Sequence, residues 1–241
     1  MTTSWLKGPV PETKFALNFK CPIYVASEPN TDLINRLTKY ILELEENIIR
    51  KEELVSNVPK AKEDPYQHTQ QWKQHNLFDD VRGKGGEHLT RFPHNPATDE
   101  LLELVRIHYL THLIELGYPR EKVYVHGWAN VLRKGEWISK HAHISSQNSY
   151  LAATYYLTTN NTTLHFENIT NAYDVFGTKT ERGKLVLFPS WLPHWSDECK
   201  DEDLRISIAI DIVTETTVLS NPWRPHKLFD DPETMLGIDG K

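Results

Sequence analysis

Five residues in the second half of the chain have side chains that bind metals or anions, at spacings that a folded site can use. His141 and His143, in the stretch KHAHI, lie two residues apart, and His194 follows in FPSWLPHWS. Residues two apart project from the same face of a β-strand, with Cβ atoms roughly 7 Å apart, so two imidazoles placed in this way can share one metal ion. Arg205 and Ser207 repeat the same spacing. A guanidinium with a hydroxyl beside it is suited to binding a carboxylate.

The segments that carry these residues have the pattern of short β-strands. From Lys122 onward, runs rich in β-branched and aromatic residues are separated by Gly, Pro, Asn and Asp. In the run LRISIAIDIVT, one leucine and three isoleucines alternate with Arg205, Ser207 and the next two residues at the same spacing. The apolar row is expected to face the core, and Arg205 and Ser207 the opposite side. Short strands at this spacing are typical of a sandwich or barrel, and we expect a jelly roll. The runs are VYVHGWANVLRKG, SYLAATYYLTT, TTLHFENI, GKLVLFPSW and LRISIAIDIVT, and a further strand-like run, CPIYVAS, lies near the N-terminus.

Two helices are expected before the main run of strands. Asn30 can cap a helix that continues to about Lys51, because apolar residues recur there at spacings of three and four. A second helix is expected to open at Thr98 and to end at Gly117. The segment 52–97 between them is polar and irregular, and long loops of this kind are often lids or substrate loops.

These elements predict one domain over residues 1–241, of the α+β class and mainly β. Residues 1–121 are expected to form its helical and loop region, packed outside the sheets, residues 122–213 its jelly roll, and residues 214–241 its C-terminal tail. From Asn221 the tail is rich in Pro and Asp, and it is expected to be irregular and to pack through Trp223 and Phe229. A chain of 241 residues is long enough to bury the core of such a domain.

Composition limits the partners and the surroundings that we expect. The chain has 33 acidic and 27 basic residues, a formal net charge of −6 and no basic block, which argues against nucleic acid as a partner. Cys21 and Cys199 are far apart and form no CxxC pair, so neither a disulfide framework nor a cysteine zinc site is expected. No run approaches the roughly 18–20 apolar residues of a membrane span, and the N-terminus has no apolar signal core. We therefore expect a cytoplasmic protein with no membrane partner.

Five motifs together resemble those of the iron(II)/2-oxoglutarate-dependent oxygenases. More narrowly, they are similar to a prolyl-hydroxylase-like family of marine bacteria and phages, and they cover about residues 122–213. The resemblance implies a double-stranded β-helix, a mononuclear iron(II), and 2-oxoglutarate and O2 as cosubstrates. It also implies hydroxylation of a substrate C–H bond with release of succinate and CO2, in a bacterial or phage-infected cytoplasm. The motifs are WANVLRKGEWISKHAH, NSYLAATYYL, LHFEN, LVLFPSWLPHWS and RISIAIDI.

The resemblance also implies roles for individual residues. His141 matches the first iron ligand and His194 the distal one. Arg205 matches the basic residue that binds the C5 carboxylate of 2-oxoglutarate. Three further residues are expected to help bind the cosubstrate or to face the same cavity: Ser207, Tyr156 and Asn130.

His143 departs from the pattern, because it stands where the wider superfamily has Asp or Glu. The usual ligand set is two His and one carboxylate, with open positions for cosubstrate and O2. Three neutral imidazoles would leave the iron with a higher net charge. Two alternatives are open: one of the neighbouring histidines supports the ligands without touching the metal, or Glu167 or Asp197 completes the coordination. His165, in LHFEN, is expected to have a structural or substrate-side role.

Other interpretations fit the same residues. Arg205 could pair with an acid such as Glu198, Asp201 or Asp203 instead of a ligand. A cupin-like jelly roll could use three histidines in a metal-dependent dioxygenase that needs no 2-oxoglutarate. A non-enzymatic jelly-roll module would leave the histidines without a shared metal. The sequence does not choose between a small-molecule and a peptidyl substrate, and it does not indicate an oligomeric state.

Overall fold

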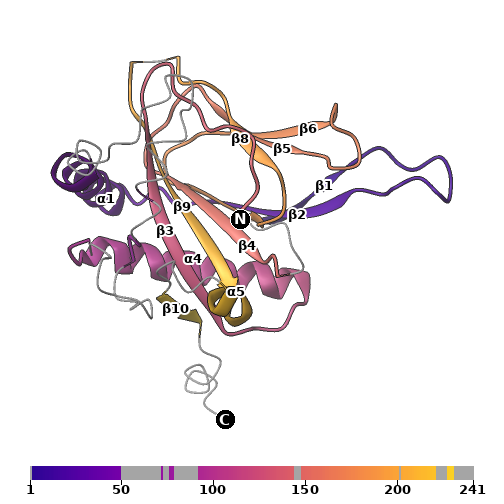
Figure 1. Ribbon diagram of the computed structural model, residues 1–241, viewed down its shortest axis with the longest axis horizontal. Coiled ribbons are helices and arrows are strands. Elements are labelled where there is room, and N and C mark those ends of the chain that lie inside the picture. Colours follow the sequence, from indigo (N-terminus) through magenta and orange to yellow (C-terminus); the bar gives the residue numbers. More distant parts are fainter. Residues whose placement is uncertain are drawn as a thin grey trace, which may run out of the picture.

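The computed structural model is mainly β, with two antiparallel sheets (Figure 1). It describes residues 2–49, 72, 76–78, 92–143, 148–200, 202–220 and 227–230. One sheet contains β1 (Thr2–Lys7), β2 (Lys20–Ser27), β3 (Val123–Leu132), β4 (Leu151–Tyr156), β7 (Lys184–Pro189), β9 (Arg205–Thr214) and β10 (Lys227–Asp230), in the order β1-β2-β7-β4-β9-β3-β10. The smaller sheet contains β5 (Thr163–Glu167), β6 (Val175–Lys179) and β8 (His194–Ser196), in the order β6-β5-β8.

The first helix, α1 (Thr31–Leu44), begins where the sequence predicts. The side chain of Asn30 accepts a hydrogen bond from the backbone N–H of Leu33 at 3.1 Å, which satisfies one of the free N–H groups at the start of the helix. The helix continues as one wider π turn over Glu45–Ile49. Its predicted end near Lys51 lies outside the described residues.

The second long helix, α4 (Pro96–Leu116), begins two residues before the predicted start at Thr98. Pro96 takes the first helical position, where its missing N–H is not needed, and the side chain of Asn95 accepts a hydrogen bond from the N–H of Ala97 at 2.9 Å. The helix ends at Gly117 as predicted. The backbone there has a φ of 69°, in the left-handed region that favours glycine.

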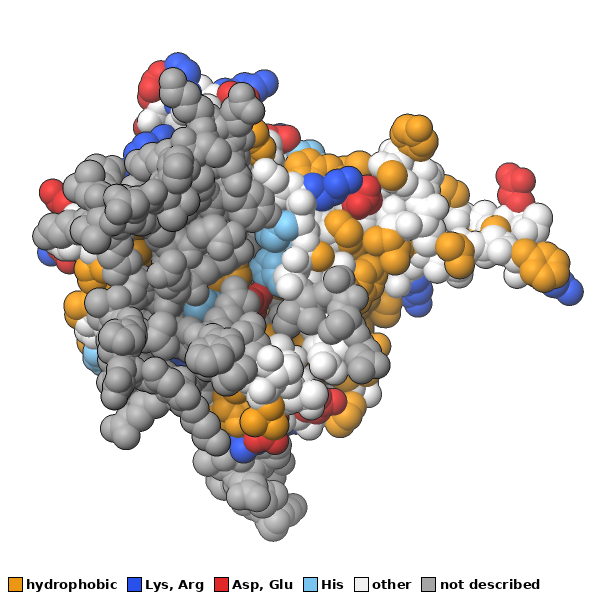
Figure 2. Space-filling model, viewed as in Figure 1, with side chains coloured by type: hydrophobic (Ala, Val, Ile, Leu, Met, Phe, Trp, Pro, Cys, Tyr) orange, Lys and Arg blue, Asp and Glu red, His pale blue; other side chains and the backbone are white. Residues whose placement is uncertain are grey.

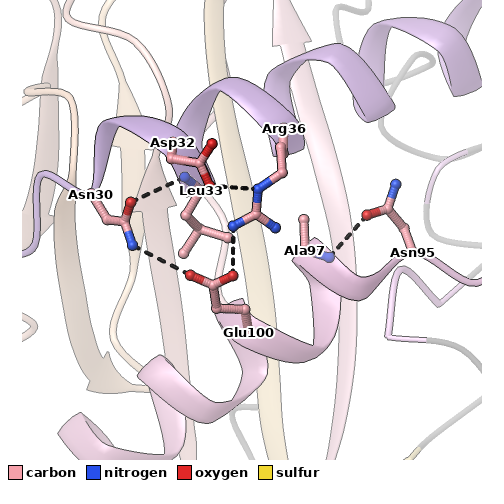
Figure 3. A network of polar contacts seen from close by, with 7 residues as sticks. All are labelled: Asn30, Asp32, Leu33, Arg36, Asn95, Ala97 and Glu100. Atoms are coloured by element: carbon pink, nitrogen blue, oxygen red, sulfur yellow. Dashed lines mark hydrogen bonds and ion pairs between the residues drawn. The ribbon is translucent and has the colours of Figure 1, made fainter.

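Polar contacts join α1 and α4 at their N-terminal ends (Figure 3). Arg36 donates to Asp32 on its own helix at 2.7 Å and to Glu100 of α4 at 2.6 Å. Asn30 also donates to Glu100, at 3.3 Å. Because these groups are exposed, each contact contributes little stability, and the buried faces of the helices have the larger effect.

Two hydrophobic cores lie on the two faces of the large sheet. The buried faces of α1 and α4 pack against one face, where they meet Ile206, Ile208 and other side chains of β3, β4, β7 and β9. The small sheet covers the other face, and Phe166 of β5 packs there against Phe188 of β7 with ring centroids 5.1 Å apart. Strand β9 therefore has one face in the helix-side core and the other between the two sheets.

The predicted strand runs correspond to β2, β3, β4, β5, β7 and β9. The sequence did not indicate β1, β6, β8, β10 or the short helix α5 (Glu215–Ser220), which are short or largely exposed. The expectation of an irregular tail was wrong at β10, which pairs with β3. The expected packing of Phe229 is confirmed, because it is buried against Tyr109 of α4 with ring centroids 5.6 Å apart, whereas Trp223 lies outside the described residues. Most of the expected lid segment, 52–97, lies outside the described residues. Within the described part of the chain, no helix combines the length and apolar character that crossing a membrane requires.

Candidate metal centre

Three histidines converge at one end of the space between the sheets. One ring nitrogen from each of His141, His143 and His194 lies within 4.8 Å of the others. His194 begins β8, whereas His141 and His143 lie between β3 and β4 in a segment that forms only a single bridge. The expectation of a regular strand at this pair was therefore wrong. Their rings still project to the same side and stack at 5.2 Å, with 14° between the ring planes.

Backbone hydrogen bonds bring these distant segments together. The N–H of His141 donates to the carbonyl of His194 at 3.0 Å, and the N–H of His194 donates back at 2.8 Å. The N–H of His143 donates to the carbonyl of Ser190 at 2.9 Å. These bonds hold together the backbone segments that carry the three imidazoles.

The side-chain hydrogen bonds leave the same nitrogen available on each ring. Nδ1 of His141 donates to the carbonyl of Ser139, and Nδ1 of His194 donates to the carbonyl of Leu192, both at 2.8 Å. A carbonyl can only accept, so Nδ1 carries the proton and Nε2 keeps its lone pair. Nδ1 of His143 is hydrogen-bonded to the carboxylate of Asp211. A ring held in this way through its other nitrogen is typical of metal-binding histidines.

Burial lowers the pKa of His194 well below its ordinary value, and the neighbouring His143 and His141 lower it further. The ring is only 5% exposed, so water does little to stabilise its charged form. His194 is therefore neutral at pH 7. A neutral imidazole can donate its lone pair to a metal without first releasing a proton.

The two carboxylates that were alternatives for a ligand have other partners. Glu167 pairs with Lys140 at 2.9 Å. Asp197 pairs with Nε2 of His165 at 2.7 Å, and it accepts a second hydrogen bond from the backbone N–H of Thr163 at 2.9 Å. Within the described residues, the group that could hold a metal consists of the three histidines alone.

The structure also brings the expected anion-binding residues together. Ser207 lies in the middle of the group on β9, and the sheet register places Asn130 of β3 on one side of it and Tyr156 of β4 on the other. Arg205 is two residues away on the same face of β9, with its guanidinium carbon 5.7 Å from the centre of the Tyr156 ring. The four side chains are all nearly fully buried.

Several polar atoms in this group have no hydrogen-bond partner among the described residues. They are Nε and Nη1 of Arg205, the hydroxyl of Tyr156 and Oδ1 of Asn130. Among the described residues Arg205 also makes no ion pair, so neither Glu198 nor Asp203 neutralises it, while Asp201 lies outside that part of the chain. Buried polar groups without partners cost about 1–3 kcal/mol each, so their accumulation at one place indicates a ligand site.

One pocket contains both the histidines and the anion-binding residues. Apolar side chains form most of the rest of its wall, among them Trp128, Ile138, Leu164 and Phe188. Figure 2 shows histidine side chains near the centre of the molecular face, beside a hollow.

Asp211 is a site residue that the sequence analysis missed. It lies on β9, on the face that also carries Arg205, Ser207 and Ala209, and it is 1% exposed. A sequence signal was present, because RISIAIDI contains an acid in an otherwise apolar run, in register with Arg205 and Ser207.

Comparison with known proteins supports the fold. No family model and no curated protein matches this sequence. Among solved structures, a Pseudomonas putida prolyl-4-hydroxylase is 13% identical, with a TM-score of 0.51 over 80% of this chain and 88% of that chain. A Trichoplax adhaerens prolyl hydroxylase, solved with a peptide fragment of a hypoxia inducible factor, is 12% identical, with a TM-score of 0.52 over 80% of this chain and 84% of that chain. The chain therefore shares its fold with prolyl hydroxylases.

Proposed function

We propose that the protein is an iron(II)- and 2-oxoglutarate-dependent oxygenase that hydroxylates a substrate C–H bond. The main observation in support is that three imidazoles and a buried, unpaired guanidinium lie in one pocket. The similarity to the fold of prolyl hydroxylases agrees with this function. The proposal includes a double-stranded β-helix for the two sheets and one domain over residues 1–241.

In this proposal, His141, His143 and His194 hold the iron through Nε2. Imidazole is a suitable ligand for iron(II), and three such ligands leave coordination positions open for other groups. The hydrogen bonds at Nδ1 fix the rings before the metal binds. When bound, iron and 2-oxoglutarate supply the reaction with O2 that yields succinate and CO2 and hydroxylates the substrate.

Arg205 would bind the distal carboxylate of 2-oxoglutarate. A carboxylate accepts hydrogen bonds only, and the unpaired Nε and Nη1 of Arg205 and the hydroxyl of Tyr156 are donors without acceptors. Ser207 lies between Tyr156 and Asn130 and can add a further donor. Binding would therefore satisfy groups that are buried and unpaired in the free protein.

The apolar walls have a separate role in the proposal. Trp128, Leu164 and Phe188 border the pocket and keep water away from the reacting groups. The substrate enters from the side of the histidines and is either a small molecule or a peptidyl side chain. The peptide bound to the Trichoplax adhaerens enzyme supports the peptidyl alternative.

Conversion of 2-oxoglutarate to succinate, followed by NMR in air with iron(II) and ascorbate, tests this function. We expect wild-type protein to form succinate, and His194→Ala and Arg205→Gln to lose this activity. Arg36→Gln is the matched control, because Arg36 is an exposed arginine on α1. Unchanged succinate formation in His194→Ala would exclude the proposed metal site.

A cupin-like dioxygenase that does not use 2-oxoglutarate is the second candidate, because the ligand set has three histidines and no carboxylate. This function would not need Arg205. A substrate oxidation that needs the bound metal but is unchanged in Arg205→Gln, without added 2-oxoglutarate, would favour it.

A further inference from the structure

A buried carboxylate lies directly behind one of the proposed ligands. Asp211 is hydrogen-bonded through Oδ1 to Nδ1 of His143. The two side chains are 1% and 5% exposed. In the large sheet, Asp211 is flanked by His126 of β3 and Ala152 of β4. The pair is therefore held between adjacent strands, away from solvent.

The oxygen of Asp211 that contacts His143 cannot at the same time be a metal ligand. Its oxygen is bound to Nδ1, and the lone pair available to a metal is on Nε2, at the opposite side of the imidazole ring. Asp211 is also outside the group of described side chains that could share a metal, so its carboxylate would act on the metal through His143. A carboxylate at this position orients the ring and makes Nε2 a stronger donor.

Charge gives Asp211 a second role. Three imidazole ligands bring no negative charge, so they would leave both positive charges of a divalent ion uncompensated. A buried carboxylate is costly unless a positive charge lies near it. A dication on the far side of His143 and the carboxylate of Asp211 would each reduce the cost of burying the other.

We propose that Asp211 is a positioning residue of the metal site, and that its carboxylate, acting through His143, supplies the negative charge that the ligands themselves lack. This inference rests on the proposed metal site. It explains how histidine can occupy the third ligand position. The compensating negative charge lies on Asp211, behind the ligand His143, and not on the ligand itself.

Titration of the metal-free protein with Co(II), followed by visible absorption, tests the inference without any turnover. Asp211→Asn keeps an oxygen that accepts from Nδ1 and removes the charge. We expect its Co(II) affinity to fall about 10- to 100-fold. Asp197→Asn is the matched control, because it removes the charge from the Asp197–His165 pair, which lies outside the histidine cluster. Its Co(II) affinity should stay within about twofold of wild type.

Azide binding to the Co(II)-loaded protein separates charge from a merely structural role. With the carboxylate neutralised, the metal keeps more positive charge, so Asp211→Asn should bind azide more tightly than wild type while binding Co(II) more weakly. A structural defect in the metal site would weaken both Co(II) binding and azide binding. The double variant His143→Asp with Asp211→Asn moves the carboxylate to the ligand position, and we expect its Co(II) affinity to stay within about threefold of His143→Asp, because the ligand itself then supplies the negative charge.

The outcomes distinguish this inference from the proposed function. Absence of Co(II) binding in wild type would contradict the metal site itself. If wild type binds Co(II), equal affinity in Asp211→Asn, or azide binding no tighter than in wild type, would overturn the role of Asp211. If Asp211→Asn does not fold by circular dichroism, the double variant decides: a Co(II) affinity about 10- to 100-fold lower than in His143→Asp overturns the inference as well.

Discussion

Tyr156→Phe should have opposite effects on the free protein and on its complex with 2-oxoglutarate. The hydroxyl of Tyr156 is buried and has no hydrogen-bond partner in the part of the chain that the structure describes. Leaving such a group unpaired costs about 1–3 kcal/mol, and phenylalanine removes the group without leaving a large cavity. The free variant should therefore be at least as stable as wild type. A gain of about 1 kcal/mol would raise Tm by about 2–4 °C in a domain of this size.

Tyr156→Phe should weaken the binding of 2-oxoglutarate, although it does not destabilise the free protein. A hydrogen bond to a charged group contributes about 1.5–3 kcal/mol, and about 1.4 kcal/mol corresponds to a tenfold change in affinity. Loss of the hydroxyl should therefore weaken 2-oxoglutarate binding by about 10- to 100-fold. Calorimetric titration of 2-oxoglutarate into the Co(II)-loaded protein measures this loss of affinity. Thermal unfolding of the free protein measures the change in stability.

Tyr155→Phe is the matched control at the next position. The hydroxyl of Tyr155 donates to the backbone carbonyl of Glu28 at 2.9 Å, and its ring lies in the core on the helix side of the sheet. This variant should lose about 1 kcal/mol of stability and keep its affinity for 2-oxoglutarate. The reasoning would be refuted if Tyr156→Phe lowered Tm and left 2-oxoglutarate binding unchanged, because the hydroxyl would then have a structural role.

Three further predictions concern stability and reactivity. Gly127→Ala should lose about 1–3 kcal/mol in urea unfolding, because the added Cβ would overlap the buried ring of Phe78; wild-type stability would contradict this packing. Burial lowers the pKa of His112 below its ordinary 6.5, so as pH falls below about 6.5 the unfolded chain binds a proton that the folded chain does not. Stability should fall as the pH is lowered from 7.5 to 5.5, and by less in His112→Gln. An equal fall in wild type and in His112→Gln would show that His112 does not cause it. Burial raises the pKa of Cys21 to about 12, so its thiol should react with a disulfide reagent at pH 8 only after unfolding, and rapid labelling of the folded protein would show that the site is open.

Local sequence patterns predicted the elements whose signals are local. Asn30 and Gly117 mark helix ends because their side-chain or backbone chemistry is needed at those positions. The alternation in β9 also predicted that Arg205 and Ser207 would face away from the row of isoleucines. Pro96 is a stronger start signal for α4 than Thr98, because proline is favoured at the first helical position.

Contacts between distant segments explain what the sequence did not predict. His141 and His194 are joined by backbone hydrogen bonds across 53 positions, and no local pattern encodes such a pairing. Strand β8 exists largely because of its pairing with β5. Asp211 was visible as an acid in an apolar strand, but its contact with His143 depends on where the segment before β4 folds over the sheet.

Anaerobic titration of the purified metal-free protein with iron(II) and then with 2-oxoglutarate tests the central claim most directly. If the three histidines hold iron and Arg205 holds the cosubstrate, one equivalent of iron should bind and 2-oxoglutarate should then produce the visible charge-transfer band of a chelated iron(II) complex. Arg205→Gln should weaken the band at equal 2-oxoglutarate concentration. Tight binding of one iron without any band would contradict the use of 2-oxoglutarate, and failure to bind iron would contradict the metal centre itself.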